Sequence, residues 1–576
     1  MKQFSNKQKW WGFTAVTLVL LAMVGFIARF TAAAPFTGTT TVVSVDSEGN
    51  VGLVHSEYPA ISADGRFVVF QSNWLASEDT SLGKDVYVHD RQAGETSLVS
   101  VASDGTMGNA EAWPGDISGD GRYVVFDSQA STLIAGDTNG RIDIFLHDRQ
   151  TGETSRISVD SDGDQVPWHS MNPVISQDGR YVAFRSEGDF ESGVVTEGYD
   201  LFVKDRQTGE VTLVSATYDG SMNIVNANDP FISANGDYIL FWSAGTAFVE
   251  GDTNGANDVF FYDRQADELS IVSVASDGSQ GIMDSEVASV TADGRYVAFV
   301  SEASNLVAGD TNAEADIFLH DRQTGETSRI SIGLAGEEAD GNSKHPQISA
   351  DGRTIVFASY ATNLVTGDTN NRDDVFVYDR DTEEISLVSV STAEVQGNNT
   401  SYSPDVSADG QHIAFQSYAS NLVAVDDNGN DDIFVHSLSE LTTPSPTLSL
   451  NFNTGRPGSF FWAIGVGFPS GEPAILEING QVITDTLQPV DDFGNFRFIL
   501  DSINADPGFY TVRLIFNSNA TTAFTTSTAA TNTSAIATFT LDAEAPLRPQ
   551  EGDGVVLQVP AGIAFNHQTF LPVVVR

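Results

Sequence analysis

The sequence contains no cysteine and few basic residues. Without cysteine, neither a disulfide nor a lipid-modified cysteine can anchor or brace the chain. Among 576 residues, 28 Lys and Arg stand against 78 Asp and Glu, so the formal net charge is −50. A surface of this charge repels phosphate backbones and anionic lipid and attracts cations, so nucleic acid is not an expected partner.

Helical periodicity and common catalytic motifs are also missing. Gly, Asp-Gly and Asn interrupt the chain too often for an amphipathic helix to form. The sequence has no G-x-S-x-G elbow, no H-E-x-x-H pair and no Walker loop, and the serine of residues 467–471 (GFPSG) is misplaced for an elbow. We therefore expect an all-β chain without a recognisable hydrolase motif.

The long apolar stretch of the chain lies at its start. Residues 10–28 follow Lys2, Lys7 and Lys9 and precede Ala32-Ala33-Ala34. This order is typical of a secretory signal peptide over residues 1–34, cleaved after Ala34. The alternative is an uncleaved membrane anchor, because the stretch approaches spanning length. Both interpretations predict a secreted or cell-surface protein, in contact with a membrane only through an uncleaved N-terminal segment.

A tight turn recurs along the chain at intervals of 56 to 58 residues. It occurs at Asp64-Gly65, Asp120-Gly121, Asp178-Gly179, Asn235-Gly236, Asp293-Gly294, Asp351-Gly352 and Asp409-Gly410. Between these turns, the sequence alternates apolar with polar or small residues, which predicts strands and hairpins. The fifth repeat, for example, predicts strands at 287–291, 295–301, 316–322 and 327–332. Four strands in a period of this length indicate the blades of a β-propeller.

The number of strands indicates how the propeller closes. Fourth strands are expected at 97–101, 155–159, 212–216, 270–274, 328–332 and 386–390, but none follows the seventh set, which ends near His436. A similar segment, 41–45, precedes every other strand. We therefore predict a seven-bladed propeller over 40–438, closed by this N-terminal strand, which removes the exposed sheet edges. The alternative, an open solenoid, should have cap-like terminal repeats, and none is visible.

The repeat contains the unit P-x-I-S-x-D-G-R-Y-V-A-F with small variations, as at 59–70 and 346–357. This unit resembles the TolB-like and WD-repeat-like β-propeller family over residues 40–437, and its sevenfold return makes the resemblance specific. The α/β domain that precedes the propeller in TolB is missing, so a peptidoglycan-binding lipoprotein partner is not implied. The blades also exceed the roughly 42 residues common in propellers.

A second module follows a linker rich in Pro, Ser and Thr at 439–447. Residues 448–542 contain about seven alternating segments broken by Gly, Pro and Asp, which predicts a small β-sandwich. Residues 506–510 (DPGFY) resemble the tyrosine-corner region of immunoglobulin-like domains, which act as spacers or adhesive units. Residues 543–576 form a Pro-rich tail that ends in an apolar strand.

The extra length of the blades lies in the loops after the second and fourth strands, which share one face of a propeller. Five of the loops between second and third strands repeat the spacing D-x-N-x-x-x-D, which resembles half of a calcium loop and makes calcium the one cofactor suggested. The bidentate Glu that completes a calcium loop is missing. The alternative to calcium binding is that these side chains cap a tight loop through hydrogen bonds to their own backbone. The candidate calcium ligands are Asp137, Asn139, Asp143, Asp252, Asn254, Asp258, Asp310, Asn312, Asp316, Asp368, Asn370, Asp374, Asp426, Asn428 and Asp432.

Positions just before each first strand vary while the repeat around them is maintained. They place aromatic, amide and acidic groups near the mouth of the central channel, which suits a sugar or peptide ligand. The alternative, which the sequence favours, is ordinary variation at loop positions. The candidate ligand-binding residues are Tyr58, Trp113, Asn172, Asp229, His345 and, one place out of register, Tyr402. Four histidines occupy the same position of the third strand, each in a different blade: His89, His147, His320 and His436. They are therefore expected to lie too far apart to form a metal site.

Three functions follow from these features. The leading hypothesis is a secreted or surface-attached, non-catalytic recognition or scaffold propeller that binds a protein, peptide or glycan on its loop-rich face. The second is a propeller enzyme, a polysaccharide lyase or hydrolase that uses Asp229 and His345. The third is a structural envelope protein stabilised by calcium. A propeller fold is compatible with all three.

Overall fold

The computed structural model describes residues 38–438, except 74, 77–78, 80–82, 189, 191–194, 219–225 and 335, and the strands between residues 447 and 558. The chain divides into two compact units, with the boundary between Ser439 and Glu440. Among the described residues, no helix is long and apolar enough to cross a membrane. The expected signal peptide, most of the linker and most of the C-terminal tail lie outside the described residues.

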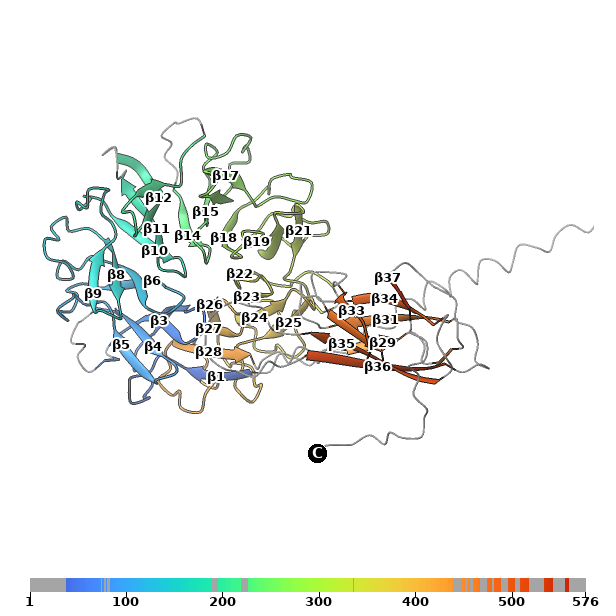
Figure 1. Ribbon diagram of the computed structural model, residues 1–576. Helices are drawn as coiled ribbons and strands as arrows, with labels where there is room; N and C mark the ends of the chain where they lie inside the picture. Colours follow the sequence, from blue (N-terminus) through green and yellow to red (C-terminus); the bar gives the residue numbers. More distant parts are fainter. Residues whose placement is uncertain are drawn as a thin grey trace, which may run out of the picture. The chain divides into compact units, whose positions relative to one another are not determined.

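The first unit consists of seven four-stranded antiparallel sheets arranged around a common centre (Figure 1). In each Asp-Gly or Asn-Gly turn the glycine has a positive φ, such as 70° at Gly65, as a tight turn between two strands requires. The strands of blades 1 to 6 are, in order, β2 (Glu57–Ile61), β3 (Phe67–Ser72), β4 (Asp85–Asp90), β5 (Glu95–Leu98); β6 (Ala112–Ile117), β7 (Tyr123–Ser128), β8 (Asp143–Asp148), β9 (Glu153–Arg156); β10 (Ser170–Ile175), β11 (Tyr181–Gly188), β12 (Val195–Asp205), β13 (Val211–Leu213); β14 (Asn228–Ile232), β15 (Tyr238–Ser243), β16 (Asp258–Asp263), β17 (Glu268–Ile271); β18 (Ser285–Val290), β19 (Tyr296–Ser301), β20 (Asp316–Asp321), β21 (Glu326–Arg329); β22 (Ser343–Ile348), β23 (Thr354–Ser359), β24 (Asp374–Asp379) and β25 (Glu384–Leu387).

Blade 7 combines the two ends of the propeller, as the sequence predicts. Its sheet has the order β1-β28-β27-β26, from β26 (Ser401–Val406), β27 (His412–Ser417), β28 (Asp432–Leu438) and the N-terminal β1 (Gly38–Val42). β1 pairs antiparallel with β28, with Thr40 opposite His436. The closed seven-bladed propeller is therefore confirmed.

The fourth strands begin one to three residues, and end three residues, earlier than the sequence suggests. β1 covers Gly38–Val42 rather than 41–45, and β5 covers Glu95–Leu98 rather than 97–101. The physical reason is a serine that follows each of these strands. The Ser44 hydroxyl donates to Asp432 Oδ1 at 2.7 Å and the Ser100 hydroxyl to Asp85 Oδ1 at 2.7 Å, so the chain leaves the sheet edge to cap the start of the third strand.

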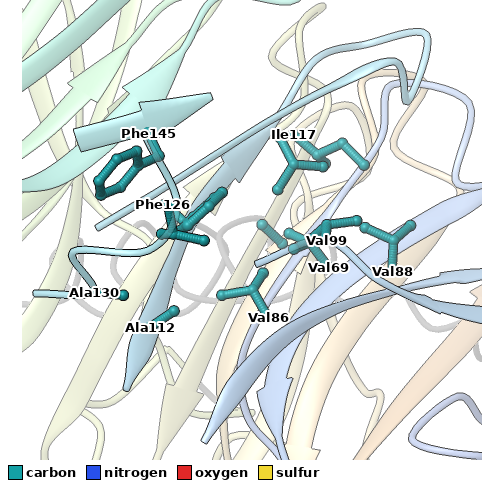
Figure 2. Close-up of a cluster of buried hydrophobic side chains, with 12 residues drawn as sticks. Val69, Val86, Val88, Val99, Ala112, Ile117, Phe126, Ala130 and Phe145 are labelled. Atoms are coloured by element: carbon teal, nitrogen blue, oxygen red, sulfur yellow. The ribbon is translucent and has the colours of Figure 1, made fainter. Parts of the chain in front are cut away.

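Hydrophobic side chains pack between adjacent blades. Figure 2 shows one such cluster, in which Val69 and Val86 of blade 1 meet Phe126 and Phe145 of blade 2, all fully buried. The rings of Phe126 and Phe145 stack with centroids 5.7 Å apart, and Phe126 is the final residue of the repeated sequence unit. An equivalent cluster with Val43 and Ile433 joins blades 7 and 1, so the closure packs like the other blade interfaces.

The second unit contains two sheets, with fully buried side chains on both, such as Leu476 and Leu500. β37 pairs in parallel with β34, so part of segment 543–576 belongs to this unit. The immunoglobulin-like topology remains a prediction. The sheets have the orders β29-β31-β34-β37 and β30-β36-β35-β32-β33, with β29 (Thr447–Leu450), β30 (Thr454–Gly455), β31 (Phe460–Val466), β32 (Ala474–Ile478), β33 (Gln481–Leu487), β34 (Phe496–Asp501), β35 (Gly508–Phe516), β36 (Thr533–Leu541) and β37 (Val555–Gln558).

Candidate functional site

The first strand of every blade contains a β-bulge, in the half nearer the long loop that leads into the strand. The pairing register shifts, for example, between Glu57 and Ala60 and between Lys344 and Gln347. In six blades a non-glycine residue in the bulge has φ between 33° and 56°. This conformation costs an L residue roughly 1 kcal/mol or more, least for Asn and Asp. These residues are Tyr58, Asn172, Asp229, Val287, His345 and Ser403.

Four of the six candidate ligand-binding residues thus share this strained position, and two do not. Tyr402, opposite Gln416, is the last paired residue before the bulge of its strand, and Trp113, opposite Asp127, lies one residue before the last paired one. The equivalence that the sequence suggested between Trp113 and Tyr58 is therefore wrong. Pro114 follows Trp113, and its ring excludes a positive φ, so the irregularity in blade 2 lies between Pro114 and Asp116.

Tyr58 and Tyr402 come together across the seam between blades 1 and 7. The Tyr58 backbone N–H donates to Gln416 Oε1 at 3.4 Å, and Gln416 Nε2 donates to the Tyr402 hydroxyl at 2.8 Å. The Tyr402 hydroxyl donates to Asp431 Oδ2 at 3.2 Å, and burial beside this carboxylate raises the pKa of Tyr402. Tyr58 is 56% exposed and Tyr418, whose ring meets His55 edge-on at 5.8 Å, is 37% exposed. The seam therefore displays aromatic surface fixed by hydrogen bonds.

The remaining candidates lie in blades 3, 4 and 6. The Asn172 backbone N–H donates to Asp127 Oδ2 at 2.9 Å, and Asp229 Oδ2 accepts from Trp242 Nε1 at 3.1 Å. Burial lowers the pKa of His345, an effect that the charge of Asp229 partly opposes, so the imidazole is neutral near pH 7. In the described part of the chain, His345 Nδ1 is buried without a hydrogen-bond partner. Asp229 and His345 thus influence each other only through charge.

His55, Glu57 and Asp431 form a group with metal-ligating atoms within 4.8 Å of one another. His55 and Glu57 already have partners. The Asp431 backbone N–H donates to His55 Nδ1 at 3.1 Å, as the Asn257 N–H does to Asp284 in blade 4, and Lys84 forms an ion pair with Glu57. A metal ion would have to displace both contacts, so the group is better explained as part of the repeated framework.

The five acidic loops share one hydrogen-bonding pattern. In blade 6, Asn370 Nδ2 donates to Asp374 Oδ2 at 2.8 Å and to the Gly397 carbonyl at 3.0 Å, while its Oδ1 accepts from the Arg372 N–H at 2.8 Å. Asn139, Asn254, Asn312 and Asn428 likewise each donate to a backbone carbonyl of the next loop. The asparagines therefore act as loop caps, the alternative that the sequence left open.

The third-strand histidines occupy equivalent structural positions, as predicted. Nδ1 of His89, His147, His320 and His436 lies 2.8–2.9 Å from a fourth-strand threonine hydroxyl, which for His436 is that of Thr40 in β1. Burial lowers the pKa of each, to about 4 for His89 and His436. These four histidines are neutral structural groups, each in a different blade.

A cavity of about 100 Å³ lies at the centre of the propeller, where the first strands of the blades end. It is lined by all seven blades and contains none of the six candidate residues. Backbone hydrogen bonds pass from blade to blade around it, such as Ala63 N–H to the Gly119 carbonyl and Ala408 N–H to the Ala63 carbonyl. Asp116 and Asp405 also line it, and burial raises their pKa to about 6 and about 7. The only sequence signal was an acid four residues before the turn in blades 2 and 7.

No protein-family model matches this chain, and no curated protein matches it. Several solved structures are similar to this chain, each with a TM-score below 0.5. A putative TolB from Agrobacterium tumefaciens is 15% identical, with a TM-score of 0.30, covering 48% of this chain and 79% of that chain. The β-propeller domain of the Trilobed protease from Pyrococcus furiosus is 11% identical, with a TM-score of 0.41, covering 68% and 99%. An acylaminoacyl peptidase is 10% identical, with a TM-score of 0.41, covering 73% and 59%. At this identity the likeness concerns the fold alone.

Proposed function

We propose that this chain is a non-catalytic recognition propeller that works outside the cytoplasm and binds a protein, peptide or glycan on its loop-rich face. The observation that carries the proposal is the set of strained bulge residues in the first strands of six blades. Glycine would adopt a positive φ at no steric cost, yet the chain places Tyr58 and His345 there. Side chains retained against a backbone cost are expected where the side chain itself has a role.

The neighbouring groups suit binding better than catalysis. Tyrosine presents a large, rigid surface with a polar tip, which is a common anchor for glycans and proteins. The hydrogen bond donated by Gln416 and the one that Tyr402 donates to Asp431 hold Tyr402 in place before a ligand arrives. The net charge of −50 favours partners that are neutral or basic where they touch the propeller.

Replacement of Tyr58 by glycine should separate binding from folding. Tyr58→Gly removes a 56% exposed ring and relieves the positive φ, so the Tm should stay within about 2 °C of the wild type or rise. The affinity for ligands found on glycan and peptide arrays with the full chain should fall about tenfold or more. Val287→Gly is the matched control, because it changes the same bulge in blade 5 without removing an aromatic ring.

Equal binding by wild type and Tyr58→Gly would contradict the proposed face, whatever the Tm. The array also distinguishes the enzymatic alternative. Release of a sugar product that disappears in the double variant Asp229→Asn, His345→Gln would support a lyase or hydrolase instead of a recognition protein.

A further inference from the structure

In the acidic loops of blades 2, 4, 5 and 6, another side chain of the propeller donates to the first Asp or pairs with it. The loop of blade 7 is the exception. In blade 2, Gln165 Nε2 lies 2.9 Å from Asp137 Oδ1 and 3.3 Å from Asp143 Oδ2, and Arg156 adds an ion pair to Asp137 at 3.3 Å. One amide nitrogen therefore lies between the two carboxylates of the loop and neutralises part of their repulsion.

The same position is filled differently in other blades. In blade 6, Gln396 Nε2 lies 2.8 Å from Asp368 Oδ1 and 2.9 Å from Asp374 Oδ2. In blade 5, Arg329 Nη1 lies 3.8 Å from Asp310 and 3.0 Å from Asp316. Gln280 forms a hydrogen bond with Asp252 in blade 4, and the Tyr87 hydroxyl donates to Asp79 in blade 1.

Blade 7 has valines at both donor positions. Val51 forms the isolated bridge with Val45 that Gln165 forms with Val159, and Val42 lies opposite Phe434 as Arg156 lies opposite Phe145. Neither valine can donate to a carboxylate.

The acids of this loop remain buried all the same. Asp426 is 8% exposed, and among the described residues its Oδ1 has no hydrogen-bond partner. Asp252 and Asp368 also each have one unpartnered oxygen, but they receive a glutamine donor that Asp426 lacks. Asp432 is fully buried, and its oxygens accept from Ser44 and from Asn428 Nδ2, each at 2.7 Å. In blades 2 and 6 a single amide nitrogen reaches both carboxylates at this spacing, so the equivalent Asp426 and Asp432 are close enough to share one cation.

We propose that Asp426 and Asp432 bind a hard divalent cation of the calcium type, in the place that a glutamine or arginine side chain occupies in the other blades. Buried carboxylates without a counter-charge are costly, and calcium prefers carboxylate, carbonyl and water oxygens. Of the fifteen calcium candidates from the sequence, these two are retained, because the other four loops already contain a donor.

The site would strengthen the closure of the ring. Asp432 begins β28, the strand that pairs with β1, and Asn428 and Asn430 donate to the carbonyls of Gly52 and Leu53 in blade 1 at 2.8 and 3.0 Å. A cation between the two aspartates would therefore hold the blade 7 loop in the position in which it contacts blade 1.

The test compares thermal unfolding of the full chain in chelator and in millimolar calcium at equal ionic strength. The wild-type Tm should rise by about 3 °C or more with calcium, the effect of a ligand in large excess over its Kd. Asp426→Asn should lose this rise, whereas Asp368→Asn, the matched change in blade 6, should keep it. Equilibrium dialysis with radioactive calcium should show one site fewer in Asp426→Asn than in Asp368→Asn.

A second variant covers the case that Asp426→Asn does not fold. Val51→Gln places in blade 7 the amide found in blades 2, 4 and 6, so it should raise the Tm in chelator and abolish the response to calcium. An equal calcium response in the wild type and in Val51→Gln would overturn the proposal, as would a wild type that does not respond or that responds equally to sodium chloride.

Discussion

Deletion of residues 35–45 should lower the Tm by about 10 °C or more and cause the protein to self-associate. The deletion removes β1 and the fully buried Val43, and it takes the Thr40 hydroxyl from His436 and the Ser44 hydroxyl from Asp432. The lost burial and the buried polar groups left without partners cost roughly 5–10 kcal/mol. The freed edge of β28 would also be exposed to pairing with a second chain. Calorimetry and light scattering measure the two effects.

Two controls separate closure from the mere loss of residues. Deletion of residues 1–34 alone should leave the Tm unchanged, because β1 stays in place. Thr40→Val and Thr154→Val remove the same hydroxyl contact to a histidine, one at the seam and one inside blade 2. A deletion of 35–45 that melted with the wild type and stayed monomeric would contradict the role assigned to β1.

The propeller was predictable because its information is local and repeated. The Asp-Gly turns, the alternating residues of the second strands and the fourth-strand segments each recur along the sequence. The limits of the fourth strands were not predictable to the residue, because they depend on Ser44, Ser100 and their equivalents, whose partners lie about fifteen residues away or, for Ser44, at the far end of the chain. Long-range capping of this kind leaves no periodic signal.

The candidate site was predicted only in part, for a related reason. The six variable residues lie within the first strands and not before them. The strained conformation of four of them could not be inferred, since Tyr and His do not signal a positive φ as glycine does. The acidic loops looked alike in sequence. Their difference depends on Gln165, Arg329 or Val51, each on another segment, so only the folded ring shows which loop lacks an internal donor.

Asp405 should make the stability of the propeller depend on pH. Its Oδ2 accepts from the Ile61 N–H at 2.8 Å and its Oδ1 from the Val406 N–H at 2.9 Å, so it links blade 7 to blade 1 beside the central cavity. Burial, and to a lesser extent the charge of Asp116, raises its pKa from 3.8 to about 7. The folded chain therefore retains a proton that the unfolded chain has already released.

The sign follows from this difference. Between the unfolded pKa of 3.8 and the folded value of about 7, the folded state binds the additional proton, so this contribution to stability is complete in acid and is lost as the pH rises through about 7. A full shift of this size would correspond to about 4 kcal/mol, and access to water in the channel reduces it to about 2 kcal/mol between about pH 5 and pH 8.

The measurement is the free energy of unfolding of the wild type and of Asp405→Asn across this range. The variant should be less stable than the wild type at about pH 5, because its amide cannot accept both backbone N–H groups, and the gap should narrow by about 2 kcal/mol by about pH 8. The buried histidines, whose lowered pKa values act in the opposite direction, cancel in this difference. Asp116→Asn should show a smaller change that is complete by about pH 6, where its own folded pKa lies. Parallel curves for the wild type and Asp405→Asn would mean that Asp405 is charged in the folded ring throughout, and that the two N–H groups of Ile61 and Val406 offset its burial.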